Sequence, residues 1–129
     1  MTQRDPGVYL EDIEYYASAA VRFMSGYNLD QYLADEKTRA AVERALEICG
    51  EAMNNLRKIA PDIADGIPHS RAITGFRNIL VHGYAELDHN KVYDIAVRHA
   101  PELLDAVRTA LQAFPDPGEG NHLKNDTGE

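Results

Sequence analysis

The residues with the clearest chemical potential lie in one short stretch, 75–84, which reads GFRNILVHGY. It contains a guanidinium that is always charged (Arg77), an imidazole that titrates near neutral pH (His82) and a phenol (Tyr84). An arginine can hold phosphate oxygens with two parallel hydrogen bonds and offset the negative charge that grows in a transition state. A histidine can take a proton from a ribose 2′-hydroxyl or return one to it. This combination indicates chemistry on an RNA phosphodiester.

The spacing of these residues limits what one helix can do with them. On a regular helix, which turns about 100° per residue, Arg77 and Tyr84 share nearly one face and lie about 10 Å apart along the axis. Arg77 and His82 are about 140° apart around that axis, so their side chains diverge. We expect them to meet only if the helix breaks near His82 and Gly83, or if a second copy of the chain completes the site. Otherwise the stretch would be a helix-end arginine on surface carboxylates and a partly buried histidine.

Apolar residues recur at helical spacing along most of the chain, which predicts the elements that must position this stretch. The stripes are Leu10, Ile13, Tyr16 or Ala17, Ala20 and Met24; Val42, Leu46, Cys49, Met53, Leu56 and Ile59 or Ala60; Ile73, Phe76 or Arg77, and Leu80; Val92, Ile95 and Ala96; and Leu103, Leu104, Val107 and Leu111. No segment alternates apolar and polar residues over the length of a strand. The sequence therefore predicts an all-α fold: an up-and-down bundle of four main helices with a short additional helix.

Capping residues and prolines predict the helix ends. Asp35 or Thr38 can act as the N-cap of the second helix, and Ser70 as that of the third. The segment 61–68 carries two prolines and one glycine, so we expect a connecting loop there. Pro101 fits the first turn of a separate fifth helix, because that position needs no N–H donor.

Length and composition bound the class of protein. The chain has 129 residues, of which 44% are apolar and 26% charged, so we expect one helical domain over 1–114 and a disordered polar tail over 115–129. The formal net charge is −8, so any attraction for RNA needs a local basic cleft rather than the overall field. No apolar run approaches the length of a membrane span and no secretory signal is visible, so we expect a cytoplasmic protein without a membrane partner. The single cysteine, Cys49, predicts a small core residue and no disulfide.

Metal-ligand patterns are weak. Glu47 and Glu51 lie four apart, a spacing that can form half of a carboxylate metal site, but the Glu-x-x-His partners of such a site are missing and a polar edge is the better interpretation. The other histidines show no paired spacing typical of ligands and are interpreted as surface or turn residues: His69, His89, His99 and His122. We therefore expect no metal and no cofactor.

The order Arg77-x4-His82-x-Tyr84 matches the R-x4-H-x-Y signature of HEPN-domain ribonucleases, and the sequence resembles the HepT branch in particular. A signature of this length alone would be unspecific, but the likeness extends over nearly everything except the tail. The segments that carry it are 4–5, 10–13, 35–38, 46–52 and 77–82.

The resemblance implies a small α-helical toxin of a type II toxin–antitoxin pair that cleaves RNA, either tRNA or mRNA, without a metal. It implies a homodimer whose two motifs line one cleft, with Arg77 on the phosphate and His82 as the catalytic histidine. It also implies a cognate antitoxin, a minimal nucleotidyltransferase of the MntA type, which transfers AMP from ATP to the motif tyrosine, Tyr84. AMPylation would place bulk and negative charge at the mouth of an RNA cleft and so block it.

Two further residues could support such a site. In a dimer, two copies of Arg77, together with Arg71, could form a positive strip on an otherwise acidic protein. Asn78 could orient His82 or cap the end of the helix.

A different class of function fits the same resemblance. The chain could be a non-catalytic HEPN module that binds a nucleotidyltransferase and serves as its substrate-binding subunit. The intact set of Arg77, His82 and Tyr84 favours the enzyme, because a pure adaptor has no physical need for that combination.

Overall fold

The computed structural model describes residues 5–82 and 87–114, and every regular element in that part of the chain is a helix. In chain order the elements are α1 (Pro6–Met24), α2 (Leu29–Ala34), α3 (Glu36–Ile59), α4 (Pro61–Asp65), α5 (Ser70–His82), α6 (His89–Asp94), the π-helix η1 (Ile95–His99) and α7 (Ala100–Leu111). The predicted all-α class is confirmed. The expected tail over 115–129 and the position of Gly83 lie outside the described residues.

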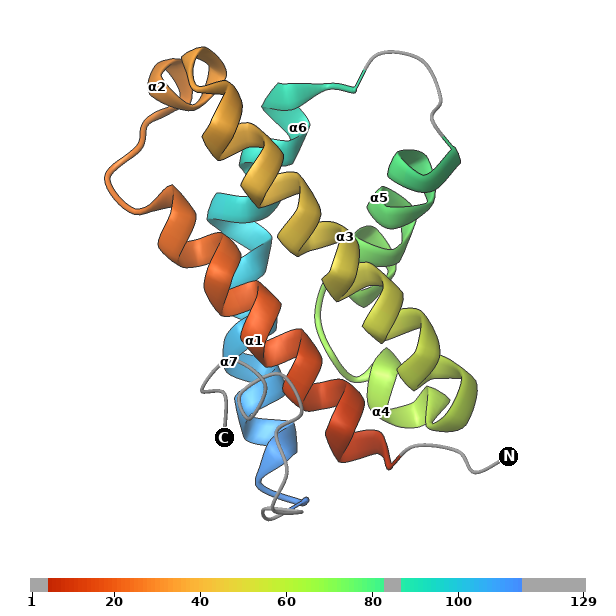
Figure 1. Ribbon diagram of the computed structural model, residues 1–129. Coiled ribbons are helices and arrows are strands. Elements are labelled where there is room, and N and C mark those ends of the chain that lie inside the picture. The colour runs from red at the N-terminus through yellow and green to blue at the C-terminus, as the bar shows by residue number, and fades with distance from the viewer. Residues whose placement is uncertain (1–4, 83–86, 115–129) are drawn as a thin grey trace, which may run out of the picture.

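The long helices run alternately up and down (Figure 1). α1 and α3 lie antiparallel at the centre of the array, α7 packs on α1, and α5 packs on α3. α5 makes only light contact with α4 and no extensive contact with α7, so it is an edge helix. None of the described helices is both long and apolar enough to cross a bilayer.

The start of α3 is set by Asp35, as predicted. The Asp35 carboxylate accepts a hydrogen bond from the backbone N–H of Thr38 at 3.1 Å and another from the hydroxyl of Tyr27 at 2.6 Å. These hydrogen bonds, that of Tyr27 first, lower the pKa of Asp35 to about 2. The cap therefore joins the α1–α2 connection to the first turn of α3.

The segment 61–68, expected to be a loop, contains a short helix, and this prediction is wrong. α4 begins at Pro61, where the missing N–H costs no hydrogen bond because the first turn of a helix has no internal acceptor for it. The predicted N-cap of α5 is also displaced. Ser70 is the first helical residue, and its hydroxyl accepts a hydrogen bond from Arg57 at 3.0 Å.

The predicted fourth and fifth helices form one continuous helical segment, because α6 leads into α7 through η1. In η1 the backbone N–H of Ala100 bonds to the carbonyl of Ile95, five residues earlier. Pro101 follows in the first turn of α7, as predicted. A proline has no N–H and its ring collides with the carbonyl four residues before it, which favours a locally wider turn here.

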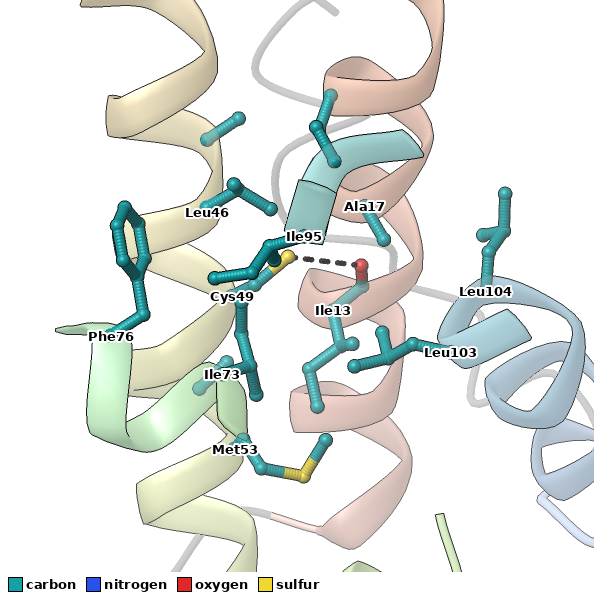
Figure 2. Close-up of a cluster of buried hydrophobic side chains, with 14 of the residues drawn as sticks. Ile13, Ala17, Leu46, Cys49, Met53, Ile73, Phe76, Ile95, Leu103 and Leu104 are labelled. Atoms are coloured by element: carbon teal, nitrogen blue, oxygen red, sulfur yellow. Dashed lines mark hydrogen bonds between the residues drawn. The ribbon is translucent and has the colours of Figure 1, made fainter. Parts of the chain in front are cut away.

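Buried side chains from all the long elements meet in one core. Figure 2 shows Ile13 of α1, Cys49 of α3 and Ile73 of α5 near the side chains of η1 and α7. The Cys49 side chain is 1% exposed and its thiol bonds to the carbonyl oxygen of Ile13 at 3.6 Å. Burial raises the pKa of this thiol, so it stays protonated and the prediction of a small core residue is confirmed.

Candidate functional site

Arg77 lies where α5 packs directly against Gly50 of α3. A Cβ placed on Gly50 of α3 would be 2.5 Å from the Cβ of Arg77 and 2.6 Å from the carbonyl oxygen of Ile73. No side chain fits in that space, so Gly50 allows the two helices to touch at the point where Arg77 leaves α5. The sequence analysis missed Gly50, although a glycine inside a helical pattern commonly has a packing reason.

The guanidinium of Arg77 does not use all of its hydrogen-bond donors within the described part of the chain. It donates one hydrogen bond, from Nη1 to Oδ1 of Asn78 at 3.2 Å, and its Nε is buried without a hydrogen-bond partner. Among residues 5–82 and 87–114, Arg77 forms no ion pair with a carboxylate. The interpretation of Arg77 as an arginine held by surface carboxylates therefore finds no support in the described part of the chain.

His82 is the last residue of α5 and is exposed. α5 is helical without interruption from Ser70 to His82, so the helix does not break before His82. On a regular helix Arg77 and His82 point about 140° apart, which leaves the two side chains of one chain diverging. Tyr84 lies outside the described residues.

Asn78 and Arg71 occupy opposite parts of α5. Asn78 is exposed and contacts Arg77 through its side-chain oxygen, so it supports the guanidinium. Arg71 is 77% exposed and pairs with Asp65 at 3.3 Å. Arg71 lies about 9 Å along the axis and about 120° around it from Arg77 on a regular helix, so one chain does not bring the two arginines together.

The face of α5 that points away from α3 is open and partly apolar. A Cβ on Gly75 would meet no atom within 4 Å. One turn further along the same face, Ile79 is 41% exposed, whereas Val81, which is 48% exposed, lies about 160° around the axis from Ile79 on a regular helix. This edge helix therefore presents one side to α3, where Arg77 lies, and a different side, which carries Gly75 and Ile79, away from it.

The described residues contain no group of three or more His, Cys, Asp and Glu side chains that could hold a metal ion. Glu47, one of the two carboxylates singled out in the sequence, pairs with Arg44 of the same helix at 3.3 Å. This places Glu47 in a solvent-facing ion pair of α3.

Sequence reasoning missed a contact between two histidines. The rings of His69 and His99 are stacked, with centroids 4.1 Å apart and planes 7° apart. His69 lies in the turn before α5, as expected, but His99 ends η1 and is half-buried rather than a surface residue. The two positions are far apart along the chain, so no spacing rule could have paired them.

Fold and site together define a small all-α protein with an arginine and a histidine on an edge helix. The chain matches the family model described as Ribonuclease HepT-like over residues 9–110, and it belongs to this family. The resemblance seen in the sequence is confirmed.

Named relatives agree with this family. The chain is 33% identical over 95 residues to "Probable ribonuclease HepT" of Thermococcus cleftensis, which covers 74% of this chain and 86% of that protein. It is 30% identical over 105 residues to "Putative RNase MJ1216" of Methanocaldococcus jannaschii, covering 80% and 84% of the two chains. A second protein of that organism, "Putative RNase MJ0127", is 29% identical over 121 residues, or 94% of this chain and 99% of the relative. No solved structure matches the chain.

Proposed function

We propose that this protein is a metal-independent endoribonuclease that works as a homodimer. The observation that carries the proposal is Arg77, a half-buried guanidinium on an edge helix with no carboxylate partner among the described residues. Such a group favours an anion, and the names of the family and its relatives indicate that the anion is RNA phosphate.

In the proposed reaction His82 takes the proton of a ribose 2′-hydroxyl, and the 2′-oxygen then attacks the adjacent phosphorus. The bond to the 5′-oxygen breaks, and that oxygen leaves with the electron pair and accepts a proton. The products are a 2′,3′-cyclic phosphate and a 5′-hydroxyl. Arg77 holds the non-bridging oxygens and offsets the charge that grows on them.

The geometry supports a cleft shared by two chains. Arg77 and His82 of one chain diverge around α5, so Arg77 would act together with His82 of the partner subunit. The open face of α5, which carries the exposed side chain of Ile79, offers an apolar contact for a second copy. We infer that α5 packs against α5 of a second copy.

The test is cleavage of a mixture of tRNA and mRNA in EDTA by the wild type and by His82→Ala, with sequencing of the new ends. We expect cuts that end in cyclic phosphate and a rate for His82→Ala that is about 10²- to 10⁴-fold lower, the usual loss for a general acid–base residue. Cleavage that disappears when the chelator is added would contradict a metal-free mechanism.

We further propose that the enzyme is the toxin of a toxin–antitoxin pair and that its nucleotidyltransferase partner inactivates it by AMPylation of Tyr84. The support is the sequence motif, in which the tyrosine follows His82 by two residues, and the family name. Co-expression with a minimal nucleotidyltransferase should add AMP to the wild type and none to Tyr84→Phe, as read by peptide mass spectrometry. Growth arrest should follow when the chain is expressed alone, and His82→Ala should relieve it.

The rival proposal is a non-catalytic module that binds a nucleotidyltransferase. It predicts equal absence of cleavage from folded wild type and folded His82→Ala, together with a stable complex with the nucleotidyltransferase. The Nε of Arg77, which is buried without a hydrogen-bond partner, favours the ribonuclease, since burying an unsatisfied donor costs free energy that a simple docking surface does not require.

A further inference from the structure

The stacked histidines join the start of α5 to the junction of η1 and α7. His69 immediately precedes α5, and its carbonyl accepts a hydrogen bond from the N–H of Ile73 at 3.0 Å, so it belongs to the first turn of the helix. Its ring lies flat on that of His99, the last residue of η1. Its Nε2 is 2.6 Å from Oε1 of Glu102 in α7. Two segments far apart in the chain, the start of α5 and the η1–α7 junction, therefore meet at the beginning of the helix that carries Arg77 and His82.

The backbone of His69 adopts an unusual conformation, which indicates that the surrounding structure holds its contacts with His99 and Glu102 in place. Its φ is 66°, the only positive φ of a non-glycine residue among those the structure describes. This left-handed conformation is unfavourable for most side chains and is kept only when the surroundings require it. Here it directs the imidazole toward His99 and Glu102.

The surroundings of His99 favour its neutral form. Burial lowers the pKa of His99, and the neighbouring charge of His69 lowers it further, while carboxylates oppose the shift. Its Nδ1 is buried without a hydrogen-bond partner. The titratable or charged groups around His99 come from several elements: His69 before α5, Cys49 of α3, Asp94 of α6, Arg98 of η1 and Glu102 of α7. α1 contributes only the uncharged side chain of Ala17.

α5 is held at a second place, the contact of Arg77 and Ile73 with Gly50. If the start of the helix came loose, α5 could pivot on that contact. Five residues of helix separate Arg77 from His82, about 7.5 Å, so a tilt of about 10° would move His82 by about 1.3 Å. A displacement of that size is enough to impair a catalytic arrangement.

We propose that His69, His99 and Glu102 are positioning residues that clamp the start of α5, and that protonation of His99 opens the clamp. Two stacked imidazolium rings repel each other; Glu102 bonds His69, and Asp94, the other carboxylate near His99, is already paired with Arg98 at 2.9 Å. The movement of α5 depends only on the fold. The further consequence, loss of RNA cleavage in mildly acidic solution, rests on the proposed function.

Hydrogen exchange tests the clamp without RNA. Protection factors of the α5 amides 72–82, relative to those of α3, would be measured at about pH 7.5 and about pH 5.5 for the wild type and for His99→Phe. Phenylalanine keeps the flat ring but cannot be protonated. We expect protection of α5 in the wild type to fall about tenfold at the lower pH and that of His99→Phe to change less than about twofold. An equal fall in both proteins would overturn the proposal.

Two further variants keep this test decisive. His89→Phe is the matched control, because His89 is also half-buried and pairs with a carboxylate, Glu43 at 3.4 Å, outside the clamp. It should behave as the wild type. If His99→Phe does not fold, His69→Asn takes its place, since asparagine accepts a left-handed φ. It should show weak α5 protection at both pH values, and wild-type protection of α5 in His69→Asn would overturn the clamp.

Cleavage separates the two proposals. The ratio of the wild-type rate to the His99→Phe rate should fall about tenfold between pH 7.5 and pH 5.5, and taking this ratio removes every pH effect on cleavage that both proteins share. No cleavage by either protein would count against the ribonuclease but leave the exchange result valid. Cleavage with a constant ratio would count against the clamp alone.

Discussion

Arg77 is the side chain on which phosphate binding at the proposed site depends. Its guanidinium is partly buried and bonded only to Asn78 among the described residues, and its Cβ lies against Gly50 of α3. A planar fork of donors can hold two phosphate oxygens at once, whereas a lysine presents a single point charge. The kind of cation should therefore matter as much as its presence.

The substitution Arg77→Lys tests this point. We expect RNA cleavage to fall by about 10- to 100-fold, because the second parallel hydrogen bond to phosphate is lost while the positive charge remains. Circular dichroism and the unfolding midpoint should stay close to those of the wild type. Full activity in Arg77→Lys would show that a charge alone is sufficient.

Asp35 provides a residue-scale prediction for pH. Its pKa is lowered to about 2 from an ordinary value of 3.8, chiefly by the hydrogen bond from Tyr27. A lowered pKa in the folded state stabilises the protein above the unfolded pKa, and this stabilisation is lost as the pH falls through about 2. Urea unfolding between pH 5 and pH 2 should therefore show a smaller loss of stability for Asp35→Asn than for the wild type. Parallel curves would contradict this role of Asp35.

At the scale of elements, the contact between α3 and α5 depends on a glycine that has no room for a side chain. Gly50→Ala would place a methyl group 2.5 Å from the Cβ of Arg77 and 2.6 Å from a backbone oxygen, so the helices must separate. We expect a loss of about 1–3 kcal/mol in the free energy of unfolding, as for other overpacked sites. Chemical denaturation measures this value.

A second helical glycine, on the side of α5 that points away from α3, gives the matched control. Gly75 is also helical, but an added Cβ meets no atom within 4 Å. Gly75→Ala should raise the free energy of unfolding by about 0.5–1 kcal/mol, because alanine loses less backbone entropy on folding. Destabilisation by both substitutions would mean that helical glycines matter here for a reason other than the α3–α5 contact.

At the scale of the whole molecule, the divergence of Arg77 and His82 leads to a prediction about subunits. If each site takes Arg77 from one chain and His82 from its partner, Arg77→Ala and His82→Ala should each be inactive alone. After the two variants are mixed and their subunits exchange, half of the dimers are mixed and each has one intact site, so about a quarter of the wild-type activity should return. Recovery of cleavage after mixing measures this directly. No recovery, with subunit exchange verified, would place both residues of a site in one chain.

The open face of α5 leads to a further whole-molecule prediction. Ile79→Glu places a charge on a side chain that is 41% exposed in the single chain. If that face is covered by a second copy, sedimentation should show a shift to monomer and cleavage should fall with it, because burying an unpaired carboxylate is costly. Thr109→Glu, on an exposed position of α7, should leave the oligomer unchanged.

Features that are local in the chain could be predicted from the sequence. Helical periodicity, the Asp35 cap, the burial of Cys49 and the family signature all depend on residues close together in sequence. The predictions of helix ends were wrong where one local pattern is compatible with two structures. A proline can break a helix or begin one, which hid α4, and the helical segment around Pro101 was divided in two because a π-turn has no distinct pattern.

The sequence by itself determined the helical class, the membership of a ribonuclease family and the residues of the motif. Tertiary structure alone decided that Arg77 lies against Gly50, that His69 stacks on His99, and that α5 is an edge helix of the array. The physical reason is that contacts between distant residues depend on where helices cross and how closely they approach. That geometry results from the packing of many side chains together, and no short stretch of sequence records it.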